Sequence, residues 1–63
     1  MCLSTVYEVC DNNEKLVCQY ASGISAKEDT VYITNITGEE CEVKGTIKNI
    51  DLVKNIILVE SSK

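Results

Sequence analysis

Short runs of strand-forming residues cover most of this sequence and constrain its fold more than any other feature. Val, Ile, Thr and Tyr cluster in these runs, Asn, Asp and Gly separate them, and the chain contains no proline. β-Branched and aromatic residues favour the pleated backbone of a sheet. The pattern predicts strands at residues 2–10, 14–20, 24–28, 30–36, 39–50 and 55–60, although residues 24–28 also fit one helical turn.

The residues between the predicted strands favour tight turns. Residues 11–13 (DNN) tolerate left-handed backbone conformations and suit a hairpin. Residues 21–23 (ASG) predict a bend or turn, and residues 37–38 (TG) predict another. Gly45 lies inside a predicted strand, where a glycine indicates a bulge or the sharp bend that closes a small barrel.

Five or six short strands at roughly ten-residue spacing predict an all-β fold, a small antiparallel barrel of the SH3-like or OB-like kind. We expect a single domain over residues 1–63. The apolar run at residues 56–59 (IILV) would be an aggregation-prone edge if it were unpaired. We therefore expect this run to be hydrogen-bonded on both sides or covered by a partner.

Charge and composition disfavour several classes of function. The chain has 10 acidic and 6 basic residues, and its net charge of -4 repels phosphate backbones and anionic lipid surfaces. We therefore expect no nucleic-acid partner and no membrane partner. The sequence has no long apolar stretch and does not begin with the basic and apolar regions of a signal peptide, which predicts a cytoplasmic protein. A catalytic role is disfavoured because no histidine is present to act as a base.

Four cysteines occur in the 63 residues, and a reducing compartment favours free thiols. They form no CxxC pair, and the absence of histidine further weakens a structural zinc site. Alternation along the strands predicts that Cys41 points inward with Val43, and that Cys18 packs together with its neighbours Leu16 and Tyr20. The remaining strand cysteine, at position 10, lies beside a turn and suggests no specific role.

Cys2 differs from the other cysteines because it is next to the chain terminus. If Met1 is removed, the amine and thiolate of Cys2 close one chelate ring around a metal. If Met1 is retained, its amine, the intervening amide nitrogen and the thiolate form two fused rings. Nitrogen and thiolate donors suit Ni(II) or Cu(II), with Zn(II) as the geometric competitor. Both donors lose protons on metal binding, so binding should weaken below neutral pH.

This chelate supplies only part of a four-coordinate site. Cys10 is eight residues from Cys2, roughly 26 Å along an extended strand, which is too far for both thiols to share one ion. A symmetric dimer whose N-termini meet at the two-fold axis would supply two nitrogens and two sulfurs. The alternative is that Cys2 only packs at the start of a strand.

The Met1-Cys2-Leu3 start, the length, the all-β pattern and the closing run at residues 45–60 (GTIKNIDLVKNIILVE) resemble the CooT-type proteins. These are small nickel-binding accessory proteins for the maturation of carbon monoxide dehydrogenase. The resemblance implies a small barrel, a homodimer, and Ni(II) bound through Cys2 with Met1 as co-donor. Its partners would be a client nickel enzyme or the maturation factors of that enzyme.

Two other functions fit parts of the sequence. Hydrogenase-maturation chaperones of the HypC type also begin Met-Cys, but they typically carry a proline soon after this cysteine and a histidine further along, and this chain has neither. A protein-interaction barrel that binds no metal, with Cys2 only packing, is the alternative from a different class. The sequence thus predicts a non-enzymatic nickel-binding accessory protein, a metallochaperone, with these two functions as alternatives.

Overall fold

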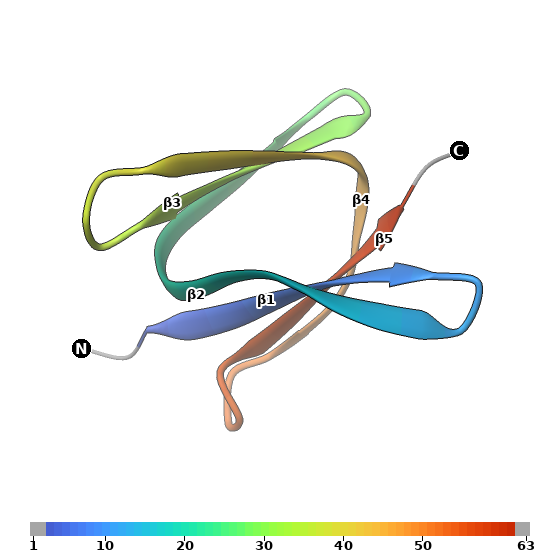
Figure 1. The fold of residues 1–63 in the computed structure, drawn as a ribbon, viewed down its shortest axis with the longest axis horizontal. Coiled ribbons are helices and arrows are strands. Elements are labelled where there is room, and N and C mark those ends of the chain that lie inside the picture. Colours follow the sequence, from blue (N-terminus) through green and yellow to red (C-terminus); the bar gives the residue numbers. More distant parts are fainter. Residues whose placement is uncertain (1–2, 62–63) are drawn as a thin grey trace.

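The computed structural model describes residues 3–61, which form five β-strands and the turns between them (Figure 1). The all-β prediction is confirmed. No helix of membrane-crossing length and apolarity occurs within these residues. The strands are β1 (Ser4–Cys10), β2 (Asn13–Lys27), β3 (Thr30–Asn35), β4 (Glu40–Asp51) and β5 (Ile56–Ser61).

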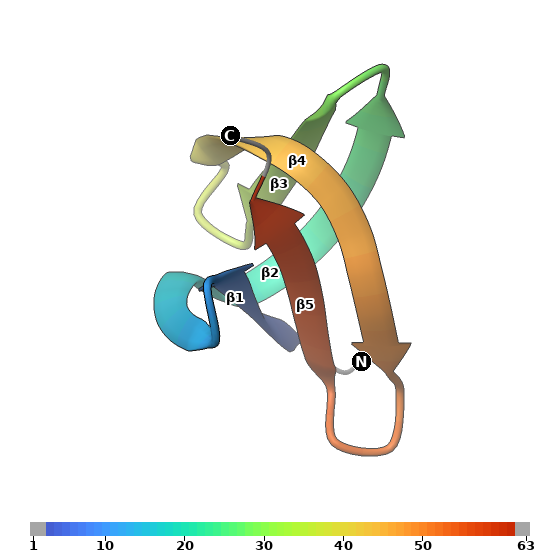
Figure 2. The same ribbon diagram turned by 90° about the vertical axis from the view of Figure 1, so that its right-hand side faces the viewer.

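The five strands close into one barrel in chain order (Figure 2). Each consecutive pair is antiparallel, and β5 closes the ring by pairing in parallel with β1. The predicted small barrel is therefore confirmed, with one parallel ladder among its five. Residues 56–59 are paired on both sides, with β4 and with β1, as expected. Closure leaves this apolar run with no free edge.

A single bent strand, β2, replaces the two strands predicted at residues 14–20 and 24–28. Its first half pairs with β1 up to Ala21, and its second half pairs with β3 from the same residue. Residues 21–23 bend the chain without ending the strand, because β2 begins to pair with β3 at the point where its pairing with β1 ends. Tyr20 has a positive φ of 60°, and the register with both partners shifts close to it. Such irregularities are β-bulges, which sharpen the bend of a strand.

The bulges also overturn part of the predicted side-chain pattern in β2. Cys18 and Ala21 are both buried although they are three residues apart. Strict alternation would have placed Leu16 and Tyr20 on the inner face with Cys18. They are instead 49% and 60% exposed, because the register slips between Leu16 and Cys18 and again between Cys18 and Ala21. The prediction for these two neighbours was wrong, while that for Cys18 is confirmed.

Gly45 marks the corner of β4, as predicted. Residues 40–44 of β4 pair with β3, whereas residues 45–51 pair with β5. The Gly45 N–H donates to the carbonyl of Asp29 at 2.7 Å, and a Cβ at this position would overlap the Glu60 carbonyl oxygen. Only a glycine lets the two backbones approach this closely.

Residues with left-handed backbone conformations close the hairpins. Asp11 and Asn12 both have positive φ, as a two-residue type I′ turn requires, so the predicted hairpin at residues 11–13 is confirmed. Glu28, in the turn between β2 and β3, has a φ of 56°, and Asn55, just before β5, has a φ of 58°. Asparagine and aspartate tolerate this conformation better than glutamate does.

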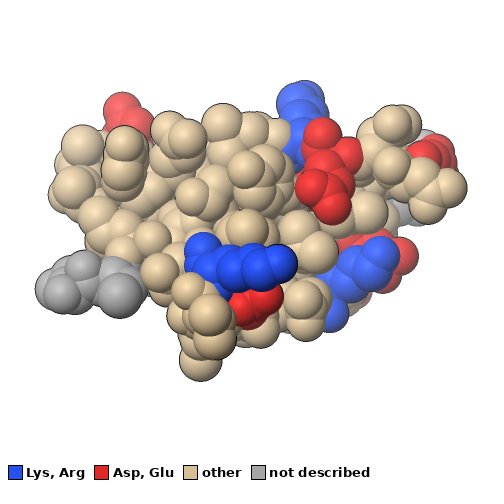
Figure 3. Space-filling view, turned by 90° about the horizontal axis from the view of Figure 1, so that it is seen from below, with Lys and Arg blue, Asp and Glu red and all other residues tan. Residues whose placement is uncertain are grey.

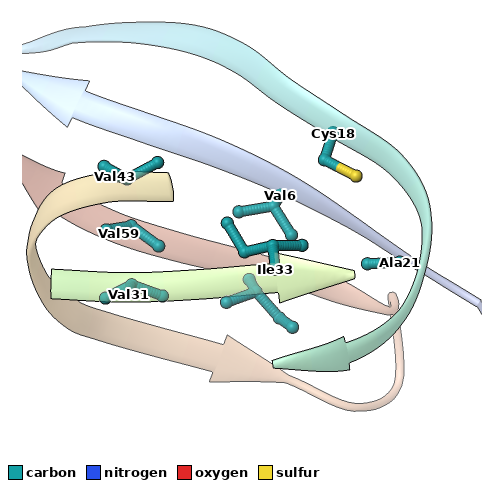
Figure 4. Close-up of a cluster of buried hydrophobic side chains, with 8 residues drawn as sticks. Val6, Cys18, Ala21, Val31, Ile33, Val43 and Val59 are labelled. Atoms are coloured by element: carbon teal, nitrogen blue, oxygen red, sulfur yellow. The ribbon is translucent and has the colours of Figure 1, made fainter. Parts of the chain in front are cut away.

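The core fills the barrel with small and β-branched side chains (Figure 4). Val6, Val31, Ile33 and Val59 have no appreciable exposure, and Ile33 is the largest of them. Such residues fit the narrow interior of a five-stranded barrel. The buried cluster consists of Val6, Cys18, Ala21, Val31, Ile33, Val43, Ile57 and Val59.

Candidate metal-binding end of the barrel

The predicted metal ligands, Met1 and Cys2, lie outside the described residues. The structure does define the chain that follows them. Leu3 is half-buried, and β1 begins at Ser4. The local setting of the candidate site is therefore built from β1 and its neighbours.

Both sides of β1 are hydrogen-bonded from its first residues. Ser4 lies opposite Ala21 of β2, and Thr5 lies beside Ile56 of β5. The Thr5 N–H also donates to the Asn55 carbonyl at 2.9 Å. A strand with ladders on both sides is held firmly by its neighbours, so the point at which the N-terminal segment joins the barrel is fixed.

Exposed apolar side chains flank the start of β1. Tyr20 lies next to Ala21 in β2, and its carbonyl accepts the N–H of Ile36 at 3.1 Å. Leu52 and Val53 lie in the loop that leads to β5. These four residues, which we call the apolar rim, are Tyr20 (60% exposed), Ile36 (57%), Leu52 (78%) and Val53 (93%). Figure 1 shows the start of β1 beside the bend of β2 and the β4–β5 loop.

Charged side chains are distributed unevenly on the face of the molecule seen from below. In the view from below, Lys, Asp and Glu gather mostly over the half toward the β1–β2 hairpin, and the opposite half is largely uncharged (Figure 3). The uncharged half is the one toward the start of β1. Exposed apolar side chains grouped in this way are typical of a surface that contacts another protein.

The Asp51 and Asn35 side chains near this end accept hydrogen bonds from the residues that follow them and so stabilise two turns. The Asp51 carboxylate accepts the N–H groups of Val53 and Lys54, each at 3.0 Å. The Asn35 side-chain oxygen accepts the N–H groups of Thr37 and Glu39, each at 3.0 Å, and the Thr37 hydroxyl at 2.7 Å. These bonds fix the two loops that carry Ile36, Leu52 and Val53.

Among residues 3–61, no three His, Cys, Asp or Glu side chains come together in a group that could hold a metal ion. Cys10 is half-buried at the first hairpin, with its sulfur 4.0 Å from an Asp11 carboxylate oxygen. Cys18 is in the core, and Cys41 packs against the core while remaining partly exposed. The inward placement predicted for both is confirmed.

One feature of the thiols was not found from the sequence. Cys41 packs against the buried cluster that contains Cys18, and the two thiols are close enough to interact electrostatically. Burial raises the pKa of the Cys18 thiol above its ordinary value of 9.0, and the nearby Cys41 thiol and Glu39 carboxylate shift it in the same direction. Alternation within each strand could not reveal that these thiols lie near each other, because β2 and β4 are not neighbours in the barrel.

The chain is similar to known proteins both in sequence and in fold. The sequence pattern of one protein family, described as the CO dehydrogenase accessory protein CooT, matches residues 1–60. The chain belongs to the CooT family. The match covers the Met1-Cys2 start and all but the last residues, and it favours the CooT resemblance over the HypC-type alternative. Membership places the chain among accessory proteins of an enzyme.

A solved structure supports the same assignment. The crystal structure of a candidate CooT protein from Carboxydothermus hydrogenoformans is 26% identical to this chain, with a TM-score of 0.87. The similarity covers 98% of this chain and 100% of that one. The CooT barrel is thus shared over its full length. No curated protein matches the chain.

Proposed function

We propose that this CooT-family protein binds Ni(II) through the Cys2 thiolate, with the Met1 amine as co-donor, and holds it for a CO dehydrogenase. The main support is the family match, which begins at residue 1 and therefore includes both proposed donors. The accessory role comes from the family, and the choice of nickel comes from the chemistry of the donors. An amine and a thiolate on adjacent residues form a compact chelate suited to late divalent metals.

The described residues favour a site at the N-terminus over one elsewhere in the barrel. No group of three donor side chains occurs among residues 3–61, and the Asp51 carboxylate near the start of β1 is engaged with backbone N–H groups. The core cysteine, Cys18, has a raised pKa and is largely shielded from solvent. Donors at the terminus avoid these restrictions.

We further propose that two copies associate through the apolar rim. Burying this rim would remove exposed Leu52 and Val53 from water, and both lie in the loop whose Asn55 carbonyl binds β1. A two-fold axis at this end would bring the two N-terminal segments together. The two chains would then supply two amines and two thiolates to one nickel ion.

Calorimetric titration with Ni(II) tests the ligand assignment. Cys2→Ser should lower nickel affinity by at least about 100-fold, since loss of one strong metal ligand typically costs several kcal/mol. Cys10→Ser is the matched control, because Cys10 lies at the other end of β1 and should leave affinity unchanged. Equal affinity of the wild-type and Cys2→Ser proteins would contradict the proposal. Affinity no higher than that of a simple thiol in both proteins would favour the metal-free interaction barrel.

A second pair of variants tests the rim. Val53→Asp places a charge in the proposed interface and should shift the protein to monomer, as measured by light scattering during size-exclusion chromatography. Leu16→Asp is the control, because Leu16 is also exposed but pairs with Tyr7, away from the rim. If Val53→Asp leaves the mass unchanged while Leu16→Asp halves it, the dimer uses a different surface.

A further inference from the structure

At the end of β3, the chain next to β4 and the bend of β2 are both hydrogen-bonded to the same turn. Elsewhere β3 lies between these strands and pairs with both. A turn begins at Asn35, the last residue of β3. The Asn35 N–H donates to the Glu39 carbonyl at 3.0 Å, and the Ile36 N–H donates to the Tyr20 carbonyl. Tyr20 lies two residues after Cys18, and Glu39 lies two residues before Cys41. Both cysteines are therefore close in sequence to residues that bind the same turn.

Both thiols lie on the inner side of the barrel at this point. Cys18 is opposite Val6, and Cys41 is opposite Ile33. Directly opposed residues of an antiparallel pair share a face, and both partners are fully buried. Figure 4 shows the Cys18 sulfur on the inner side of β2. Cys41 packs against the buried cluster to which Cys18 belongs, and it is partly exposed.

We propose that Cys18 and Cys41 are an oxidative modification site, which forms an intramolecular disulfide when the protein meets a peroxide. The Cys41 thiol loses its proton and the thiolate attacks a peroxide oxygen. The O–O bond breaks, the hydroxide that leaves takes up that proton as water, and Cys41 becomes a sulfenic acid. The Cys18 sulfur then attacks the Cys41 sulfur, and the hydroxyl group leaves as water with the Cys18 proton. Two thiols lose two protons and two electrons, and these reduce the peroxide to two waters. A dithiol reductant reverses the bond by exchange.

Exposure assigns the order of these two steps. Cys41 can meet an oxidant from solvent, whereas Cys18 is only 6% exposed. Burial also raises the pKa of Cys18, which lowers its reactivity toward free peroxide, so the oxidised sulfur that it encounters is the sulfenic acid on Cys41. Cys41 is thus the first thiol to be oxidised, and Cys18 resolves it.

Cys10 is excluded as a partner by its position in β1. Cys18 is opposite Val6, and Cys10 lies four residues further along the strand, about 13 Å away. The Cys18–Cys41 bond would instead join two strands that share no ladder. It would hold β2 and β4 together at the base of the turn that carries Ile36 in the apolar rim.

Peptide mapping of the wild-type protein tests this proposal directly. The reduced, metal-free protein is treated with one equivalent of hydrogen peroxide, alkylated and digested with trypsin. Cleavage after Lys15, Lys27 and Lys44 puts Cys18 in residues 16–27 and Cys41 in residues 28–44, while Cys2 and Cys10 stay together in residues 1–15. We expect a bond between the first two peptides and an intact mass lower by two hydrogens.

The variants separate this bond from other oxidation products. Cys10→Ser should keep the bond, and Cys41→Ser should lose it, with recovery of the alkylated residue 16–27 peptide. Full alkylation of Cys18 and Cys41 after peroxide treatment would overturn the proposal. So would a bond from either one to residues 1–15 or to a second chain. The metal-free protein is used, so the outcome does not depend on nickel binding.

Discussion

Replacing Gly45 with alanine tests the barrel closure at its tightest point. The new Cβ would overlap the Glu60 carbonyl oxygen and lie 3.0 Å from its carbonyl carbon. Relief requires β4 and β5 to separate where Gly45 pairs with Ser61 and Thr46 pairs with Glu60. Loss of two ladder positions at about 1 kcal/mol each, plus residual backbone strain, gives a total of about 2–4 kcal/mol.

This loss is large for a chain of this size, whose free energy of unfolding should be roughly 3–9 kcal/mol at about 0.05–0.15 kcal/mol per residue. We expect Gly45→Ala to lower the thermal midpoint by roughly 10–30 °C. Urea unfolding followed by circular dichroism, at one protein concentration for all variants, gives the change in free energy directly.

The other two glycines are internal controls. A Cβ at Gly23 would lie 4.0 Å from the Thr34 Cβ, an ordinary contact, so Gly23→Ala should change stability by less than about 0.5 kcal/mol. Gly38 has open space around it but a φ of 92°, so Gly38→Ala should cost about 1 kcal/mol from backbone strain alone. If Gly45→Ala proves no more destabilising than Gly23→Ala, β4 and β5 do not approach as described.

Three further predictions concern the turns and the buried thiol. Glu28→Gly should raise the free energy of unfolding by about 0.5–1 kcal/mol because φ is 56° there, whereas Lys27→Gly, in β2, should lower it; urea titrations of both that show the same sign would contradict this. Asn35→Ala should cost about 1–2 kcal/mol through loss of three accepted hydrogen bonds, and Asn35→Asp should cost less in the same assay because it keeps the acceptor. The raised pKa of Cys18 means that the folded state holds this proton more tightly, so the stability it contributes is present below pH 9.0 and is lost as pH rises through the folded-state pKa. Stability measured at pH 7 and pH 10 should therefore fall less in Cys18→Ala than in the wild-type protein, and an equal fall would contradict the assignment.

Local sequence signals were sufficient for much of the fold. Residues 11–13 predicted a hairpin because two of them adopt positive φ, and Gly45 predicted a bend because a larger residue would meet Glu60. The apolar run at residues 56–59 predicted a strand paired on both sides. Each of these features depends on residues close in sequence or on the burial of a strongly apolar run.

Features that depend on the relative register of several strands were not predictable in the same way. The bend of β2 at residues 21–23 arises because β1 and β3 share this strand, which no local pattern specifies. The parallel β1–β5 ladder joins the two ends of the chain. The proximity of Cys18 and Cys41 and the apolar rim likewise need the closed barrel, since they bring together segments that are distant in sequence.

The candidate metal site is a different matter, because Met1 and Cys2 precede the described residues. The sequence supplied the donors and the resemblance, and the family match over residues 1–60 confirmed the resemblance. The structure adds the fixed start of β1 and the apolar side chains around it. Together these features carry the proposal of a nickel ion shared between two chains.

Native mass spectrometry of the wild-type protein with added Ni(II) tests this central proposal most directly. The account predicts a species containing two chains and one nickel ion, which disappears in Cys2→Ser and persists in Cys10→Ser. One nickel ion on each separate chain, or a nickel-bound dimer that survives Cys2→Ser, would contradict it.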